Sequence, residues 1–151
     1  MAPIESELKC VVSGSFSKAK PEIDLAIEEL TDLGVTVLAP EKGWLYKPPQ
    51  RVILPEDRQF RPLPSEVSMN PGQVEDEFLR CITKSDFVYV VNPDGYVGDM
   101  VAFEIGFALA NGVRVIALNP ISTNLDEDPA WKARVSKIEV MQLEKVVLNT
   151  L

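Results

Sequence analysis

The stretch Ser85–Leu118 reads SDFVYVVNPDGYVGDMVAFEIGFALANGVRVIAL and determines the fold class. The run Asp86–Asn92 is continuously apolar, β-branched and aromatic, which is typical of a parallel strand covered on both faces. The polar turn PDGYVG separates it from Asp99–Asn111, whose small and apolar residues predict a buried helix. Gly112 ends that helix, and VRVIALN predicts the next strand. A strand, a helix and a strand joined by short connections indicate a parallel α/β sheet.

The flanking sequence repeats this alternation. Leu8–Phe16 predicts a short buried strand that ends in a loop of small residues, and Pro21 suits the first turn of a helix that Gly34 ends. We therefore predict one domain over residues 1–151, with a three-layer α/β/α fold and a doubly wound five-stranded parallel sheet of the flavodoxin/Rossmann-like class. The strands are expected near residues 8–13, 35–39, 86–92, 113–118 and 138–144.

Residues 41–72 break the pattern. Seven of the twelve prolines fall in Pro40–Pro71, and five basic residues stand against four acidic ones in residues 41–72. A long irregular segment inside a compact domain is commonly either functional or a solvated surface loop, and both interpretations stay open. As a lid, it would bring a basic or aromatic side chain to a ligand or to a neighbouring subunit. The candidates are Tyr46, Arg51, Arg58, Phe60 and Arg61.

Composition excludes several classes of function. The 23 acidic and 15 basic residues give a net charge of −8, which disfavours nucleic acid polymers and anionic membranes as partners. No apolar run approaches the roughly 20 residues of a membrane span, and the N-terminal MAPIESELK has no signal-like apolar region. Cys10 and Cys81 stand in apolar contexts, as expected of reduced thiols in a cytoplasmic protein. The absence of histidine removes the usual nucleophile–histidine pairs and the commonest zinc ligand, so we expect no metal site.

Two loops should carry the site, because ligands bind such sheets at the carboxyl ends of the strands. The first, Ser13-Gly14-Ser15-Phe16-Ser17, offers hydroxyls and backbone N–H groups that suit a phosphate or a sugar hydroxyl. It lacks the spacing of dinucleotide and Walker-type loops, and a tight turn is the alternative interpretation.

The second loop, Asn92–Asp99, places polar residues between an apolar strand and an apolar helix. Gly98 or Asp99 can cap the helix, and Asn92, Asp94 and Tyr96 are further candidates for substrate contact.

Glu104 is the main catalytic candidate. It is the only charged residue between Asp99 and Arg114, and it stands among apolar residues. Burial of an unpaired carboxylate is costly, so Glu104 faces a cleft, points out of the helix, or pairs with a cation, Arg114 or Lys84. An ionisable group at the binding end of an apolar element is a site candidate.

These residues carry a family resemblance. Ser85–Leu118, with AFEIGFA as its specific part, resembles the core motif of the nucleoside 2-deoxyribosyltransferases and their nucleotide N-glycosidase relatives, and the SGSF loop agrees in position. The resemblance implies a flavodoxin-like fold and a small-molecule nucleoside or nucleoside monophosphate as substrate. It also implies a glutamate nucleophile, Glu104, that displaces the base. No metal or redox cofactor is implied, and the expected assembly is a homo-oligomer in which a neighbouring subunit often completes the site.

Two positions depart from the family pattern. Gly98 stands six residues before Glu104, where the family often has an acidic or hydroxyl residue, and Asp99 follows it. Phe78 stands where the family tends to have an aspartate, next to Glu77. We therefore expect Asp94 or Asp99 to act as the proton donor, with Asp94, Asp99 or Glu77 substituting for the missing side chains.

Two other functions compete with this one. The first is the phosphoribohydrolase group that resembles cytokinin-activating enzymes, whose motif PGGxGTxxE is similar to Pro93–Gly98. Glu104 lies six residues after Gly98, however, where that motif needs four. The second is a nucleotide- or nucleoside-binding module that has kept the fold without the chemistry.

Overall fold

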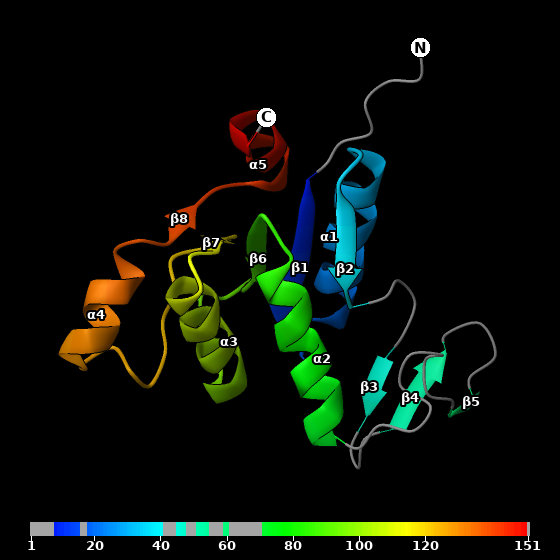
Figure 1. The fold of residues 1–151 in the computed structure, drawn as a ribbon, viewed down its shortest axis with the longest axis horizontal. Coiled ribbons are helices and arrows are strands. Elements are labelled where there is room, and N and C mark those ends of the chain that lie inside the picture. The colour runs from blue at the N-terminus through cyan, green and yellow to red at the C-terminus, as the bar shows by residue number, and fades with distance from the viewer. Residues whose placement is uncertain are drawn as a thin grey trace.

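The computed structural model describes residues 8–15, 18–40, 45–47, 51–54, 59–60 and 71–150. Its main sheet has five parallel strands in the order β2-β1-β6-β7-β8, which confirms the predicted fold class (Figure 1). The strands are β1 (Lys9–Gly14), β2 (Thr36–Ala39), β6 (Phe87–Val91), β7 (Arg114–Ala117) and β8 (Glu139–Val140). The helices are α1 (Lys20–Asp32), α2 (Pro71–Thr83), α3 (Asp99–Ala110), α4 (Pro129–Val135) and α5 (Leu143–Thr150).

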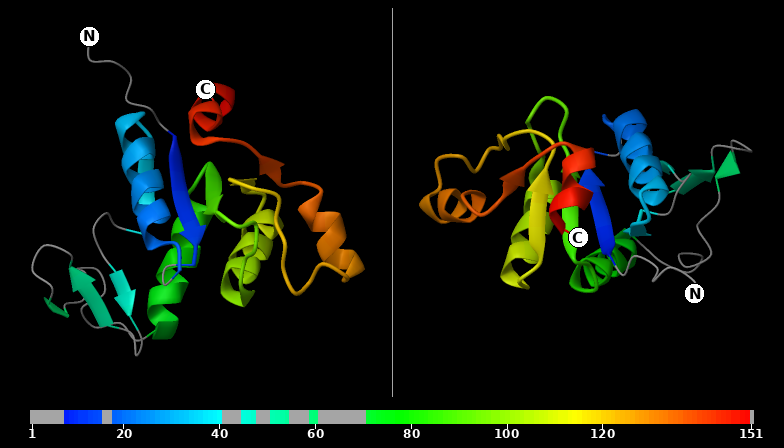
Figure 2. Two further views of the ribbon diagram at one scale, coloured as in Figure 1. Left: turned by 180° about the vertical axis from the view of Figure 1, so that it is seen from behind. Right: turned by 90° about the horizontal axis from the view of Figure 1, so that it is seen from above.

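Two apolar layers cover the sheet, because alternate residues of a strand point to opposite faces. On one face Cys10 and Val12 of β1 pack with residues of α1 and with Val146 of α5. On the other face Val11 packs with residues of α2, α3 and α4, including Ile82 and Ile105. Helices therefore lie on both faces of the sheet (Figure 2). None of the helices in the described segments is long and apolar enough to span a membrane.

The pairing of β1 with β6 determines where the site lies. The register aligns Cys10 with Phe87 and Gly14 with Val91, in parallel, as predicted. The chain leaves β1 toward β2 on one side and returns to β6 on the other, so the order of the strands reverses between β1 and β6. The loops that follow these two strands therefore flank the usual ligand crevice of an open α/β sheet.

The C-terminal prediction is corrected in part. The last strand is only Glu139–Val140, where residues 138–144 were expected, and Leu143–Thr150 form helix α5 instead of strand and tail. Leu143 and Val146 are three residues apart and therefore lie on one helical face, and both belong to the apolar layer beside α1. The segment forms a helix because a β-strand would place Leu143 and Val146 on opposite faces.

The described parts of the segment 41–72 contain regular structure, where the sequence predicted an irregular loop. Three short strands, β3 (Leu45–Lys47), β4 (Arg51–Leu54) and β5 (Gln59–Phe60), form a separate antiparallel sheet, and α2 already begins at Pro71. The β-branched pair in RVIL favours a strand, a signal that the density of prolines masked. The expected lid contacts of Tyr46, Arg51, Arg58, Phe60 and Arg61 concern side chains outside the described residues.

The two cysteines form no disulfide. Cys10 is buried in β1, and burial together with nearby Asp86 raises the pKa of its thiol to about 12. Cys81 on α2 is half-buried. A thiol with so high a pKa is protonated and unreactive near neutral pH, as expected of a core residue.

Candidate active site

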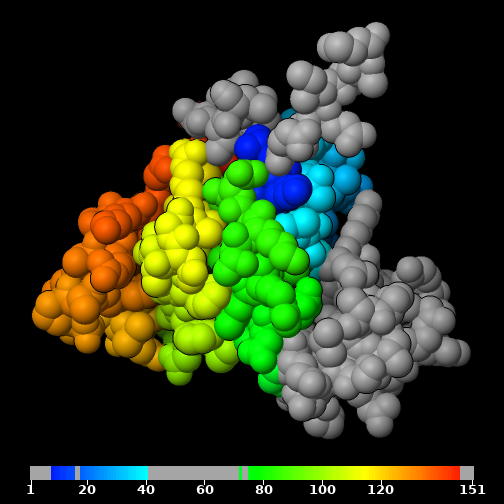
Figure 3. Space-filling model, viewed as in Figure 1, coloured from blue at the N-terminus to red at the C-terminus, as the bar shows by residue number. Residues whose placement is uncertain are grey.

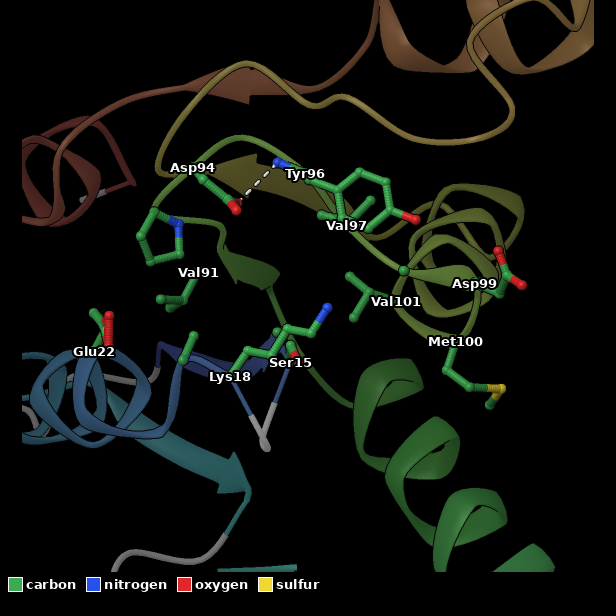
Figure 4. Close-up of a pocket in the computed structure, with 14 residues that line it drawn as sticks. Ser15, Lys18, Glu22, Val91, Asp94, Tyr96, Val97, Asp99, Met100 and Val101 are labelled. Carbon is green, nitrogen blue, oxygen red and sulfur yellow. Dashed lines mark hydrogen bonds between the residues drawn. The ribbon is translucent and has the colours of Figure 1, made fainter.

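A pocket of about 600 Å³ lies between the loops that follow β1 and β6. Its wall is formed by the end of β1, the beginning of α1, the loop after β6 and the first turn of α3 (Figure 4). The lining residues are Gly14, Ser15, Lys18, Ala19, Glu22, Val91, Pro93, Asp94, Tyr96, Val97, Gly98, Asp99, Met100 and Val101. The pocket therefore occupies the crevice that the sequence predicts, with both predicted loops on its wall.

Gly14 has a packing role in this wall. A Cβ at this position would lie 2.8 Å from the backbone oxygen of Val91 and 3.1 Å from Cδ1 of Ile23. Glycine is therefore needed where β1 passes closely between β6 and α1. Phe16, which belongs to the same predicted loop, lies outside the described residues.

The loop after β6 is held by a reciprocal pair of asparagines. Asn92 donates from Nδ2 to the carbonyl oxygens of Asn119 (2.8 Å) and Gly95 (3.1 Å), and its Oδ1 accepts from the backbone N–H of Asn119 (3.0 Å). Asn119 in turn donates to the carbonyl oxygen of Asn92 (2.9 Å). Asn92 is 1% exposed, so its amide positions the loop rather than reaching the pocket.

The remaining candidates of this loop lie on the rim of the pocket. Asp94 is exposed and accepts the backbone N–H of Tyr96 at 3.1 Å. Gly98 is the N-cap of α3 and has no side chain to cap it. Asp99 is exposed on the first turn, and Figure 4 shows its carboxylate pointing away from the pocket centre, whereas Lys18 extends into the pocket. Neither aspartate is brought into contact with Glu104.

Glu104 lies one layer deeper than the pocket, at 4% exposure. The hydroxyl of Ser13, which is itself buried in β1, donates to Oε1 of Glu104 at 2.8 Å. Glu104 is not part of the pocket wall, but its neighbourhood is, because Val101 precedes it by about one helical turn and Gly14 follows Ser13. The carboxyl group of Glu104 is therefore buried next to the part of α3 that forms the pocket wall.

Glu75 on α2 is the second member of this buried site, and the sequence analysis missed it. The carboxyl groups of Glu75 and Glu104 share a hydrogen bond. Burial, followed by the hydrogen bond and charge of Glu75, raises the pKa of Glu104 well above its usual range, while the Ser13 hydroxyl opposes the rise. The pKa of Glu75 is also raised, first by burial.

The pair holds a proton at neutral pH. Oε2 of Glu75 is buried, and no N–H or O–H group of the described residues donates to it. Two adjacent carboxylates repel each other, so one of the two carboxyl groups keeps its proton. That proton supplies the hydrogen for the hydrogen bond between them. Ser13, Glu75 and Glu104 thus form a cluster in which burial and the contact with Glu75 favour a proton on Glu104.

The other acidic candidate on α2 points elsewhere. Glu77 pairs with Arg80 one turn along the helix, with 3.1 Å between Oε2 and Nε. Phe78, at the position where the family tends to have an aspartate, is buried in the apolar layer over the sheet. Glu75 precedes Phe78 by three residues and Ile82 by seven, so it occupies the inward stripe of α2. A carboxyl group in an apolar stripe is the signal that identified Glu104, and it would also have identified Glu75.

The cations proposed as partners of Glu104 are placed elsewhere. Arg114 forms a two-pronged ion pair with Glu139, in which Nη2 lies 2.7 Å from Oε2. Lys84 is exposed beyond the end of α2. Glu104 contacts the hydroxyl of Ser13 and the carboxyl group of Glu75, and Arg114 is paired with Glu139, so the ion-pair interpretation with Arg114 is wrong.

Comparison with known proteins places the fold. No family model matches the chain, and no curated protein matches it. A CMP N-glycosidase of Clostridium botulinum, BcmB, has a similar structure, with a TM-score of 0.56, 15% identity and coverage of 93% of this chain and 98% of its own. A conserved protein of Enterococcus faecalis V583 is similar at a TM-score of 0.57 and 16% identity, over 93% of this chain and 95% of its own.

The chain shares its overall fold with these two structures. At this identity the likeness concerns the arrangement of the chain and not individual residues, so the chemistry must be argued from the cluster itself. Among the residues that the structure describes, no group of three or more acidic or cysteine side chains could hold a metal ion. The chemistry available next to the pocket wall is that of two carboxyl groups and a hydroxyl.

Proposed function

We propose that this protein cleaves, or transfers a sugar at, the N-glycosidic bond of a (deoxy)nucleoside or nucleoside monophosphate, with Glu104 as nucleophile. The observation that carries the proposal is the buried cluster of Glu104, Glu75 and Ser13 next to the pocket wall at the switch point of the sheet. The similar fold of a CMP N-glycosidase supports the same class of reaction.

The carboxyl pair suits a reaction that needs a nucleophile and an acid together. For the reaction, the shared proton passes from Glu104 to Glu75, which leaves Glu104 as a carboxylate oriented by the Ser13 hydroxyl. Its oxygen forms a bond to the anomeric carbon as the bond from that carbon to the base nitrogen breaks. The electron pair of the broken bond stays on the base.

Glu75 is then the proposed proton donor to the departing base. Burial raises the pKa of Glu75, which favours the protonated form that a general acid must have. This assignment replaces the expectation that Asp94 or Asp99 donates the proton, because both lie on the rim without contact to Glu104. We propose that these two aspartates bind hydroxyl groups of the substrate instead. Water or a second base attacks the glycosyl-enzyme and releases Glu104.

The carboxyl group of Glu104 must become accessible from the pocket for this reaction. At 4% exposure its carboxyl group reaches substrate only when the wall formed by Gly14 and Val101 parts or when the side chain turns past Val101. A binding module without chemistry would leave the cluster closed. The two functions therefore differ in whether base is released, and an assay can separate them.

The test is an incubation with a panel of nucleosides, deoxynucleosides and their 5′-monophosphates, CMP included, with chromatographic detection of free base. We expect base release by the wild-type protein and its loss in Glu104→Gln by about three orders of magnitude or more, because the neutral amide of glutamine cannot replace the carboxylate nucleophile. Glu28→Gln, an exposed glutamate on α1, is the matched control and should keep full activity.

Two results would overturn the proposal. One is base release by Glu104→Gln at most of the wild-type rate. The other is thermal protection of the wild-type protein by a nucleotide with no base released from any compound of the panel, which would assign a binding module. Addition of a second base separates the two outcomes of the reaction, since only a transferase forms a new nucleoside.

A further inference from the structure

One aromatic ring stands open on the wall of the pocket. Tyr96 is 44% exposed and lines the pocket, and Figure 4 shows its ring extending from the loop after β6 toward the first turn of α3. The core tyrosine differs, because Tyr89 is 1% exposed and its hydroxyl donates to the carbonyl oxygen of Met141 at 3.3 Å. No described residue forms a hydrogen bond with the hydroxyl of Tyr96. The ring of Tyr96 therefore contributes to the pocket and not to the core.

The backbone that carries this ring is fixed on both sides. The N–H of Tyr96 donates to Oδ1 of Asp94 at 3.1 Å. Its neighbours pair with Ser122 as in a parallel sheet: Ser122 donates to the carbonyl oxygen of Gly95, and Val97 donates to that of Ser122, each at 2.9 Å. Because the backbone is held, only the two side-chain torsions of Tyr96 remain to be ordered when a ligand binds. A ring presented in this way is suited to binding, since little conformational freedom is lost.

The ring belongs to an apolar part of the pocket wall. Met100, which is 54% exposed, lines the pocket from the first turn of α3, together with the buried Val97 and Val101. Aromatic rings stack on flat π systems, and the thioether of methionine makes favourable contacts with aromatic rings. The charged lining residues, such as Lys18, suit the polar parts of a ligand instead. The wall of Tyr96 and Met100 therefore fits a flat aromatic group.

We propose that the base of the bound nucleoside or nucleotide stacks on the ring of Tyr96, in contact with Met100. The inference rests on the proposed function for the class of ligand, a base joined to a sugar, but not for the reaction. The pocket of about 600 Å³ has the usual size of a small-molecule site. Every base has a π face, so stacking accepts bases in general and favours the larger purines over pyrimidines.

The test is the affinity for adenosine, cytidine and their 5′-monophosphates, measured by isothermal titration calorimetry in the Glu104→Gln background, where the proposed reaction does not consume the ligand. Tyr96→Ala should weaken binding by about 10- to 100-fold, the usual effect of removing one stacked aromatic ring. Tyr96→Phe, which keeps the ring, should stay within about 3-fold. Phe103→Ala is the matched control and should not change the affinity, because Phe103 is 52% exposed but does not line the pocket. Helix α3, which carries Phe103, lies at the surface between α2 and α4 (Figure 3).

Tyr96→Trp distinguishes a base from a sugar on this wall. Its fluorescence should be quenched by AMP and unchanged by ribose 5-phosphate, because only the base has a π system that can stack on the indole. Quenching by ribose 5-phosphate to the same extent, or no quenching by AMP, would contradict the stacking of the base.

With Glu104 intact, Tyr96→Ala should raise KM for base release by the same factor and leave kcat within a few-fold, because a stacked base is held equally before and during bond cleavage. Weaker binding in Tyr96→Ala together with no base release by the wild type would overturn the proposed reaction alone. Base release with an unchanged KM in Tyr96→Ala would overturn the stacking alone. So would equal losses in Tyr96→Ala and Tyr96→Phe, a loss of affinity in Phe103→Ala, or no binding of any of the four compounds.

Discussion

Ser13 and Glu104 are 91 residues apart in the chain and are joined by a hydrogen bond of 2.8 Å in the buried layer between β1 and α3. The bond exists because parallel pairing with β6 places β1 in the interior of the sheet, between β2 and β6, where it contacts α3. A hydroxyl that donates to a carboxylate favours the ionised form, so Ser13 lowers the pKa of Glu104 while burial and Glu75 raise it.

Replacement of Ser13 by alanine should therefore raise the pKa of Glu104 further. We expect the rising limb of the pH–rate profile for base release to move to higher pH, and the rate at neutral pH to fall by about 10- to 100-fold. Ser136→Ala, which removes an exposed hydroxyl at the end of α4, is the control. An unchanged pH profile in Ser13→Ala would mean that this hydrogen bond does not tune the nucleophile.

Replacement of Glu75 by glutamine distinguishes the roles of the two carboxyl groups. The amide keeps the size of the side chain and can donate to Glu104, so the pKa of Glu104 should fall because the repelling charge is gone. Base release should also fall, by about 10²- to 10⁴-fold, because the proposed proton donor is lost. Substrates whose bases leave without protonation should lose much less, and a comparison of good and poor leaving groups measures this difference. An equal loss of rate for substrates with good and with poor leaving groups would contradict the role of Glu75 as an acid.

Most of the fold could be predicted from local patterns. The apolar run Asp86–Asn92 and the alternation of strands and helices correctly indicate a parallel five-stranded sheet. The errors occur where one signal obscured another, since prolines hid the antiparallel strands β3 to β5. At the C-terminus, β-branched residues suggested a longer strand where the apolar spacing of Leu143 and Val146 builds a helix.

The candidate site was predictable only in part, because its geometry depends on contacts between distant segments. Glu104 was recognisable as a lone charge in an apolar helix. The role of Asn92 was not, because its partners on Asn119 become neighbours only when β6 pairs with β7. Glu75 stands beside two other acidic residues, Asp76 and Glu77, and only its place in the apolar stripe of α2 could have distinguished it from them.

The stability of the protein should decrease as the pH rises. The pKa of Glu104 is higher in the folded protein than in the unfolded chain, so the folded state binds its proton more tightly. The resulting stabilisation is complete below the unfolded pKa of about 4.3 and is lost as the pH rises through the folded pKa. Urea unfolding at pH 5 and pH 9 should show the difference for the wild type. In Glu104→Gln the difference should be much smaller, and an equally steep decline in that variant would assign the effect to other groups.

Introduction of a side chain at Gly14 tests how closely the first loop is packed. The Cβ of Gly14→Ala would lie 2.8 Å from the backbone oxygen of Val91, and backbone in the middle of a parallel sheet cannot move aside. We expect a loss of about 1–3 kcal/mol in the free energy of unfolding, measured by urea denaturation, because the strands β1 and β6 must separate locally. Gly98→Ala is the matched control, since a Cβ there meets nothing within 4 Å, and its stability should stay near that of the wild type. The same displacement of β1 would move Ser13 away from Glu104, so Gly14→Ala should also show the shifted pH–rate profile of Ser13→Ala. If Gly14→Ala is less stable but keeps the wild-type pH–rate profile, the displacement of β1 is confined to Gly14 and does not move Ser13.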